Sequence, residues 1–380
     1  MGNIVFCADG TWNRPGTDDS ADQPSYPTNV FKIFTNLEGV DSAETICEAD
    51  EQERVAKDAA GATAQIAKYL HGVGDSDNIL VKLLGGTIGT GTIARIVRGY
   101  TFVSRNYAPG ARIFLIGFSR GAYTVRALAG LIQAKGLLDA TQLSLATDKG
   151  QAYRLGAAVW HDYQRALLAA HPNPTLLSRF DALAADLPDF LSRPPTASLV
   201  SPVPIDTVGV WDTVGALGIP DYTSTGAVAD LFRFANTTLG PGVSAGFHAV
   251  SRDERRGDFT PTLWDADARI QQLLFAGAHG DVGGGYPTTN SESGLSDLTL
   301  QWMTGLLNAR GVLFGAKETF SPAPNPCGCA HQPWLTPPFD LLPILKRVFP
   351  QTLPESPSVQ ARRDGGPVLF DPSMAPAQYV

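Results

Sequence analysis

The chain of 380 residues is 43% hydrophobic and only 17% charged, and its net charge at neutral pH is −8. Such a chain can bury a large core, and we expect residues 1–380 to form one domain. The acidic balance argues against binding to nucleic acid. The start, MGNIVFCADG, lacks a basic region, and no apolar run approaches about 18 residues. We therefore expect a cytoplasmic protein without a signal peptide or a transmembrane segment.

Apolar runs and turn residues divide the first part of the chain into short elements. The expected elements are a strand at 3–8, a helix at 30–37, an acidic surface loop at 38–62, a strand at 65–70 and a helix at 92–107. The Gly-rich stretch 85–91 precedes that last helix. It lacks the Gly-Lys-Ser/Thr ending of a nucleotide-binding loop, so we interpret it as a place of close backbone packing.

The second part continues the alternation of strands and helices. We expect strands at 112–118, 203–211 and 270–276, helices at 120–133, 245–254 and 294–310, a helical insertion or lid at 139–203, and a Pro-rich C-terminal segment at 321–380 with a short helix near 340–348. Strands that alternate with helices predict an α/β fold, here α/β-hydrolase-like. Its mostly parallel sheet would carry helices on both faces.

The motif Gly-Phe-Ser-Arg-Gly at 117–121 is the most informative stretch of the chain. An apolar strand leads into it, and an amphipathic helix follows at once. This strand–turn–helix context is typical of a nucleophile elbow, in which small residues flank a strained and exposed serine. We therefore predict that Ser119 is a nucleophile at the start of a helix, where the helix dipole favours developing negative charge.

A nucleophilic serine needs a base, and the base needs a carboxylate that holds its tautomer. His279 follows a predicted strand within a Gly-rich stretch, and we predict that it is the base. His248 is the second candidate, and His71 is expected to line the cleft. Asp212 ends another predicted strand, and the order Ser, Asp, His is that of α/β-hydrolases. Asp281 lies so close to His279 in sequence that we expect it to shape the loop.

The oxyanion of a tetrahedral intermediate needs two backbone donors. The amide of Arg120, directly after the nucleophile, is one expected donor. The other is expected from Gly10 or Thr11, after the first strand, where glycine allows close approach. Asp9 precedes them and is expected near the site. It also supports a rival interpretation, in which Asp9 is the centre of a metal-dependent or phosphotransfer enzyme.

The four cysteines offer no strong metal site. Cys327 and Cys329 form a lone Cys-X-Cys pair near His331, and the second ligand pair that a zinc site needs is missing from the sequence around them. The cysteine usage fits a reducing compartment. We expect the protein to hold no metal ion and to need no cofactor.

Seven groups of residues in this chain occur in the same order in a known family. The chain resembles the α/β-hydrolase-like proteins of bacteria and fungi that include the type VI secretion phospholipase effectors. The matching segments are CADGTWN (7–13), PTNV (27–30), HGVG with GGTIGTG (71–74 and 85–91), GFSRGAYTVRALAG (117–130), VWDTVGALG (210–218), HAVSRDERR with PTLW (248–256 and 261–264) and FAGAHGDVGGGY (275–286). The resemblance implies a triad of Ser119, Asp212 and His279 and an acyl-ester substrate, a phospholipid in the effectors.

The leading prediction is thus a serine esterase or lipase that forms an acyl-enzyme on Ser119. A non-catalytic, partner-binding module on a hydrolase scaffold is one alternative, and a metal-dependent hydrolase centred on Asp9 is the other. The expected partners are an acyl-ester or phospholipid substrate and a membrane surface in peripheral contact. The resemblance also implies non-classical export as an effector, together with a cognate inhibitor protein.

Overall fold

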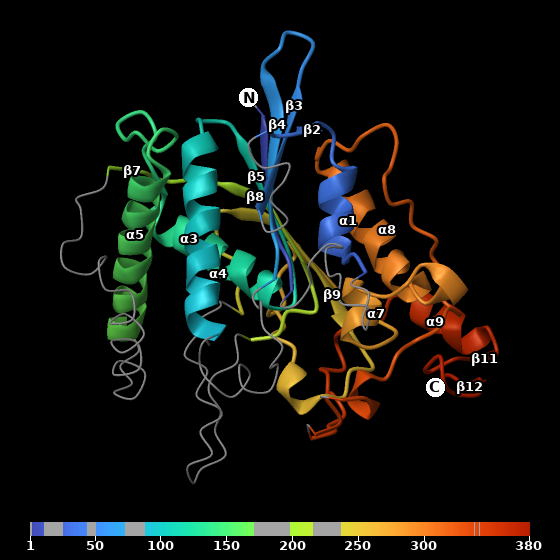
Figure 1. Cartoon of the computed structure of the whole chain (residues 1–380). Coiled ribbons are helices and arrows are strands. Elements are labelled where there is room, and N and C mark those ends of the chain that lie inside the picture. Colours follow the sequence, from blue (N-terminus) through green and yellow to red (C-terminus); the bar gives the residue numbers. More distant parts are fainter. Residues whose placement is uncertain are drawn as a thin grey trace.

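A sheet of eight strands lies at the centre of the described part of the chain, between two layers of helices (Figure 1). The computed structural model describes residues 2–10, 26–43, 51–72, 88–170, 198–215, 237–337, 339–341 and 343–380. The strands of this sheet are β1 Asn3–Ala8, β2 Val40–Asp41, β3 Glu51–Lys57, β4 Thr63–Leu70, β5 Arg112–Phe118, β8 Ile205–Trp211, β9 Val243–Ser251 and β10 Ile270–Phe275. Their order is β10-β9-β8-β5-β1-β4-β3-β2.

Six of these strands, from β10 to β4, are parallel, and β3 and β2 add an antiparallel edge. The prediction of a loop over residues 38–62 is therefore wrong at Val40–Asp41 and Glu51–Lys57, which form β2 and β3. The sequence of β3, EQERVAK, is charged and only partly buried, as edge strands often are. Such a strand lacks the apolar pattern on which the prediction depended.

Two helical layers cover the two faces of the sheet. Helices α3 Ile88–Asn106, α4 Arg120–Lys135 and α5 Lys149–Ala170 lie on one side, and α1 Asn29–Asn36 and α8 Gly294–Ala309 lie on the other (Figure 1). Alternate residues of β1 supply the two cores: Ile4 and Phe6 pack under α3 and α4, while Val5 and Cys7 pack under α1. The predicted α/β class, a mostly parallel sheet with helices on both faces, is confirmed.

Two predicted helices are absent at their expected places. Residues 245–254 contain most of β9, which is buried between β8 and β10. The periodicity of a short apolar run does not separate a buried strand from a helix. Near 340–348 the described residues form only the 3-10 turn Phe339–Leu341, and Ile344 forms an isolated β-bridge with Arg256. Pro343 lacks a backbone donor and disfavours a helix at this point.

The described part of the predicted insertion at 139–203 is mainly α5, which packs on the outer side of α3 and also contacts α4 (Figure 1). Two short strands, β6 Leu137–Leu138 and β7 Leu199–Val200, pair at its base. The stretch 171–197 lies outside the described residues, so the role as a lid stays a prediction. No helix among the described residues is both long and apolar enough to cross a membrane.

The C-terminal segment packs beside β10 and the short helix α7 His279–Gly283. It contains α9 Pro357–Asp364 and the hairpin of β11 Pro367–Val368 and β12 Ala377–Gln378. A small core of Ala276, Val359, Val368 and Tyr379 joins this segment to the end of β10. Because parallel strands share the edge at which they end, the predicted functional residues that follow β1, β4, β5, β8 and β10 meet at one edge of the sheet.

Candidate active site

Ser119 lies in a strained turn between β5 and α4. Its backbone has φ 57° and ψ −123°, a conformation that residues other than glycine rarely adopt. A Cβ added at Gly117 would lie 2.5 Å from the carbonyl oxygen of Gly121, and one added at Gly121 would lie 2.1 Å from that of Ala8. Both glycines are therefore required by close backbone contacts, which is the steric condition of a nucleophile elbow.

Replacing Gly121 with alanine is expected to lower the free energy of unfolding by at least about 2 kcal/mol, because the new Cβ overlaps backbone atoms of β1 that cannot move aside. Chemical denaturation measures the change. Gly305→Ala is the matched control, since no atom lies within 4 Å of its Cβ position on α8. That variant is expected to be neutral or up to about 1 kcal/mol more stable. Equal effects of the two changes would contradict the elbow geometry.

Asp212 and His279 form a short, buried hydrogen bond. Nδ1 of His279 lies 2.5 Å from Oδ2 of Asp212, and both side chains are almost fully buried. Asp212 directly follows β8 and has φ 35°, so its backbone is also strained. The amide of Ser251, at the end of β9, donates to Asp212 Oδ1 at 2.9 Å. The carboxylate is thus fixed by the neighbouring strand as well as by the imidazole.

Backbone pairing brings Ser119 to the same place. Phe118 pairs with Trp211 in the register of β5 and β8, and the amide of Ser119 donates to the carbonyl of Trp211 at 3.0 Å. Ser119 and Asp212 are therefore the next residues on two adjacent strands. The ring of Phe118 also packs on the ring of His279, with 4.5 Å between centroids. All three predicted residues therefore lie at the same edge of the sheet.

Burial lowers the pKa of His279, while its hydrogen bond to Asp212 acts in the opposite direction. A second ring, that of Phe259, packs edge-on against the imidazole. The backbone N–H of His279 donates to Glu254 Oε2 at 3.1 Å, so the start of α7 is held in place. A histidine with a lowered pKa is neutral at neutral pH, and a neutral imidazole can take up a proton as a general base.

The other candidate bases have different surroundings. His248 lies inside β9, where Nδ1 meets Gln272 at 2.8 Å and Nε2 accepts the amide of Thr213 at 3.1 Å. Burial lowers the pKa of His248 to about 3. Both ring nitrogens are thus used in packing, and the predicted helical context of His248 is wrong. His71 follows β4 and is partly exposed at the same sheet edge.

Asp281 belongs to a second aspartate–histidine pair. Its Oδ1 lies 2.6 Å from Nδ1 of His331, and its Oδ2 accepts the amides of Ala278 and His331. His331 also contacts Glu292 and stacks on Tyr286. The carboxylate of Asp281 therefore ties the start of α7, which carries His279, to the C-terminal segment. The short helix replaces the irregular loop that the glycines suggested.

One predicted oxyanion donor is occupied. The amide of Gly10 donates to Asp9 Oδ1 at 2.7 Å in this structure, and its role toward an oxyanion stays a prediction. The side chain of Asp9 itself bends back to take this bond. Thr11, the alternative donor, lies outside the described residues. Arg120 is the first residue of α4, where backbone N–H groups have no partner within the helix.

The carboxylate of Asp9 is enclosed by donors. Besides Gly10, the hydroxyls of Thr28 and Tyr69 each donate to Asp9 Oδ2 at 2.7 Å. Burial raises the pKa of Asp9 to about 6. Within the described ranges, no three His, Cys, Asp or Glu side chains are grouped as metal ligands. Asp9 therefore has the surroundings of a residue that organises the loop after β1.

Sequence reasoning missed Arg347, which lies 135 positions after Asp212. Its Nη1 and Nη2 lie 2.8 and 3.0 Å from Oδ1 and Oδ2 of Asp212. No local motif marks this arginine, because it stands in a Pro-rich stretch without periodicity. Glu254 was also missed, although it lies in one of the segments shared with the family.

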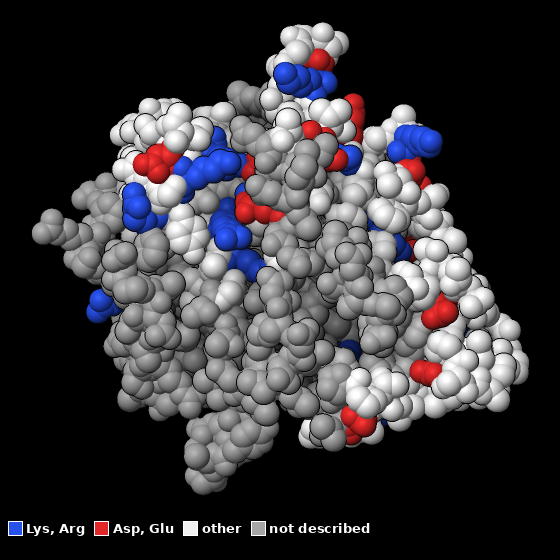
Figure 2. Space-filling view, viewed as in Figure 1, with Lys and Arg blue, Asp and Glu red and all other residues white. Residues whose placement is uncertain are grey.

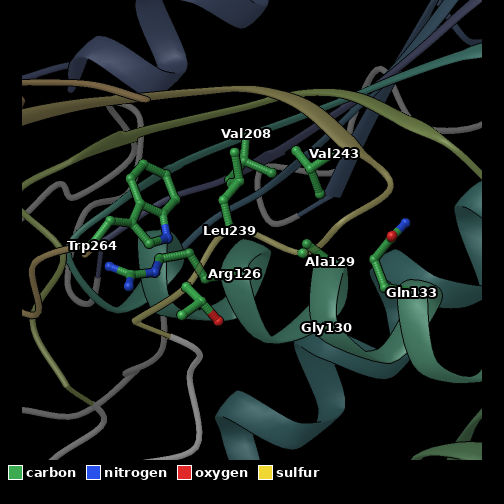
Figure 3. A pocket seen from close by; sticks show the side chains of 10 residues that line it. Arg126, Ala129, Gly130, Gln133, Val208, Leu239, Val243 and Trp264 are labelled. Atoms are coloured by element: carbon green, nitrogen blue, oxygen red, sulfur yellow. The ribbon is translucent and has the colours of Figure 1, made fainter. Parts of the chain in front are cut away.

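Two hollows in the described part of the protein lie away from Ser119, Asp212 and His279. A hollow of about 300 Å³ is lined by charged side chains of β3, β4, α3 and α5, and Figure 2 shows Lys and Arg beside Asp and Glu in the upper part of that face. Oppositely charged pairs such as Arg105–Glu53 occupy it. The other, of about 20 Å³, is lined by residues of α4, β8 and β9 together with Leu239 and Trp264 (Figure 3), and it has room for one water molecule. Neither hollow includes Ser119, Asp212 or His279.

Residues 2–305 match the family model described as T6SS, Phospholipase effector Tle1-like, catalytic domain. The chain belongs to this family. The resemblance inferred from the sequence segments is thereby confirmed. Residues 306–380, which include Arg347, lie beyond the match.

The chain is also similar to a yeast protein and, more weakly, to two solved structures. The chain is 30% identical over 272 residues to the uncharacterized protein YEL023C of Saccharomyces cerevisiae, covering 72% of this chain and 34% of the yeast protein. It therefore spans about a third of that relative. The Tle1 effector bound to the VgrG spike is 18% identical, with a TM-score of 0.35, and the match covers 75% of this chain and 52% of the effector. An uncharacterized protein from Pseudomonas aeruginosa is 16% identical, with a TM-score of 0.38, over 83% of this chain and 46% of that one.

Proposed function

We propose that this protein hydrolyses acyl esters of phospholipids, with Ser119 as nucleophile, His279 as general base and Asp212 as the carboxylate that orients the base. One observation carries the proposal above all: the strained Ser119 and Asp212 follow the paired strands β5 and β8, and His279, after β10, is hydrogen-bonded to Asp212. Family membership supplies the class of substrate.

The geometry supports the steps of acyl transfer. Since Nδ1–H of His279 donates to Asp212, Nε2 carries the lone pair and takes the proton of the Ser119 hydroxyl. The Ser119 oxygen then attacks the ester carbonyl, and the predicted donors, the backbone N–H groups of Arg120 and of Gly10 or Thr11, hold the oxyanion. His279 gives the proton to the leaving alcohol, a lysophospholipid, and the acyl group stays on Ser119. Water, deprotonated by His279, releases the fatty acid.

A lipid surface in contact with the protein is part of this proposal. Close to the site, the segment 343–348 exposes three large apolar side chains: Ile344 is 53%, Leu345 60% and Val348 93% accessible. The segment is held to the site by the backbone bridge of Ile344 with Arg256 and by the contact of Arg347 with Asp212. Apolar side chains that are exposed beside a lipid-ester site suit insertion among lipid headgroups and acyl chains.

Changing Ile344, Leu345 and Val348 together to serine is expected to lower hydrolysis of phospholipid vesicles about tenfold, because the variant loses apolar contact with the lipid surface. Hydrolysis of a soluble short-chain ester is expected to change less than about twofold, since none of the three side chains is placed among the reacting groups. Val40→Ser, at the exposed edge strand β2, is the control. Equal losses on both substrates would contradict the proposed lipid contact.

Two alternatives predict different results. A non-catalytic binding module would have no need of a strained serine beside an aspartate–histidine pair. A metal-dependent enzyme centred on Asp9 would need other ligands, whereas the Asp9 oxygens accept bonds from Gly10, Thr28 and Tyr69. The Ser119 mechanism requires neither a metal ion nor a cofactor. Family membership extends the proposal to two further points: the protein is secreted as an effector, and it has a cognate inhibitor protein as partner.

Fatty-acid release from vesicles in the presence of EDTA, before and after treatment with a fluorophosphonate, tests the proposal. Such a probe reacts with an activated serine. We expect release in EDTA, a single label on Ser119 and loss of release in proportion to labelling. Release that survives complete labelling would overturn the role of Ser119. A requirement for a divalent ion would favour Asp9, and a folded protein that neither labels nor releases fatty acid would favour the binding module.

A further inference from the structure

Arg347 makes a two-pronged contact with the carboxylate of Asp212. Nη1 meets Oδ1 at 2.8 Å and Nη2 meets Oδ2 at 3.0 Å, and the arginine side chain is only 5% exposed. The same guanidinium also donates to the carbonyls of Ser251, at 2.7 Å, and of Phe259. A planar guanidinium that binds both carboxylate oxygens fixes the orientation of the carboxylate as well as its charge.

The backbone around Arg347 is tied to the segment that follows β9. The amide of Leu345 donates to the carbonyl of Arg255 at 2.7 Å, and the amide of Gly257 donates to the carbonyl of Pro343 at 2.9 Å. These bonds place Arg347 beside Asp212. The side chains of Ile344, Leu345 and Val348 remain largely exposed, so Arg347 is the buried member of this segment. Its buried guanidinium contacts Asp212 in the site.

Asp212 needs this partner because it is fully buried. Burial alone would raise its pKa, but the Arg347 guanidinium and the His279 hydrogen bond hold the pKa well below its usual range. Without a cation, a buried carboxylate tends to take up a proton or to lose its orientation. A protonated or rotated Asp212 would no longer hold His279 in the tautomer that leaves Nε2 free.

We propose that Arg347 is a positioning residue of the active site: it keeps Asp212 ionised and turned toward His279, and it sets the pH at which His279 becomes a base. This inference rests on the proposed function and goes beyond it, since Arg347 lies outside the part that matches the family. The Pro-rich C-terminal segment then completes the site.

Four charged groups from three segments act on His279. Asp212 after β8 and Glu254 after β9 favour its protonated form, while Arg256 opposes it, and Arg347 acts by compensating the charge of Asp212. Removing Arg347 leaves the negative charge of the Asp212–His279 pair uncompensated. The pair then takes up a proton at higher pH, whichever of its two members holds that proton, so the acid limb of the activity profile moves to higher pH. Loss of structure alone would lower activity at every pH and leave the limb in place.

The test compares pH profiles of kcat/KM for a soluble short-chain ester between the wild type and Arg347→Met. We expect kcat/KM at neutral pH to fall about 10- to 100-fold and the acid limb to rise by about one pH unit. Arg347→Lys keeps the positive charge but loses the two-pronged contact with Asp212. This variant should therefore lose activity, while its acid limb shifts less than that of Arg347→Met. Lys346→Met, the exposed neighbour in the same segment, is the control and should match the wild type.

A profile of Arg347→Met that runs parallel to the wild type, or wild-type activity in this variant, would overturn the inference. If Arg347→Met does not fold, as thermal unfolding would show, Arg347→Gln replaces it; that variant also lacks the charge, and the same shift is expected. Ser119→Ala, measured alongside, separates the two claims. Full activity in Ser119→Ala refutes the proposed function, whereas an unshifted limb in a serine-dependent enzyme refutes only the role of Arg347.

Discussion

Replacing Ser119 with alanine is expected to lower kcat for ester hydrolysis by about 10³- to 10⁶-fold. The alanine lacks the hydroxyl that forms the acyl-enzyme, while the backbone amides that bind the oxyanion remain. Because φ of Ser119 is 57°, an alanine has the same backbone strain, and the variant should keep its fold. Initial rates with a soluble ester and with vesicles measure the effect.

Ser144→Ala is a suitable control for this change, because Ser144 is an exposed serine whose side chain is placed in no part of the site. That variant should hydrolyse both substrates at the wild-type rate. The nucleophile assignment would be wrong if Ser119→Ala kept more than about a tenth of the wild-type kcat, since an oxyanion site alone does not supply such a rate.

Changing Asp212 to asparagine is expected to lower kcat about 10⁴-fold. An amide has one oxygen, whereas Asp212 accepts bonds from His279, Arg347 and the amide of Ser251. In the variant an NH₂ group faces either the guanidinium or the imidazole, so His279 is driven toward the wrong tautomer. The pKa of His279 also falls, because the negative charge beside it is gone.

Asp206→Asn, on the same strand, is the matched control for Asp212→Asn. Asp206 pairs with Arg112 and Arg310 near the surface, where an ion pair contributes little. We expect its kcat to stay within about twofold of the wild type. Similar losses in the two variants would mean that the effect of Asp212→Asn reflects general instability and not its place beside His279.

The sequence was sufficient for the parts of the fold that depend on local chemistry. The bounds predicted for β1 and β5 agree with the structure, because long apolar runs end at turn residues. The helix after Ser119 was also predicted, since the Gly-X-Ser-X-Gly spacing reflects contacts between adjacent backbone segments. The pairing of Asp212 with His279 is predicted from their positions after apolar strands and from the order Ser, Asp, His along the chain, and the two side chains are hydrogen-bonded in the structure.

Other parts depend on contacts that no local pattern reports. The apolar pattern predicts a helix where β9 lies, because the burial of this strand between β8 and β10 is a property of the sheet order. The amide of Gly10 turns to Asp9 through a side-chain contact that the sequence does not show. Arg347 reaches Asp212 across 135 positions, so its partner becomes visible only when the C-terminal segment is placed in three dimensions.

The central claim, an acyl-enzyme on Ser119, is tested most directly by quenching the enzyme with acid during turnover of a slow ester and mapping the modified peptide by mass spectrometry. We predict a single acyl group on the peptide that contains Ser119, formed in a burst that matches the amount of enzyme. It should be absent from Ser119→Ala. Steady turnover without any acylated peptide, under conditions in which deacylation limits the rate, would contradict the account.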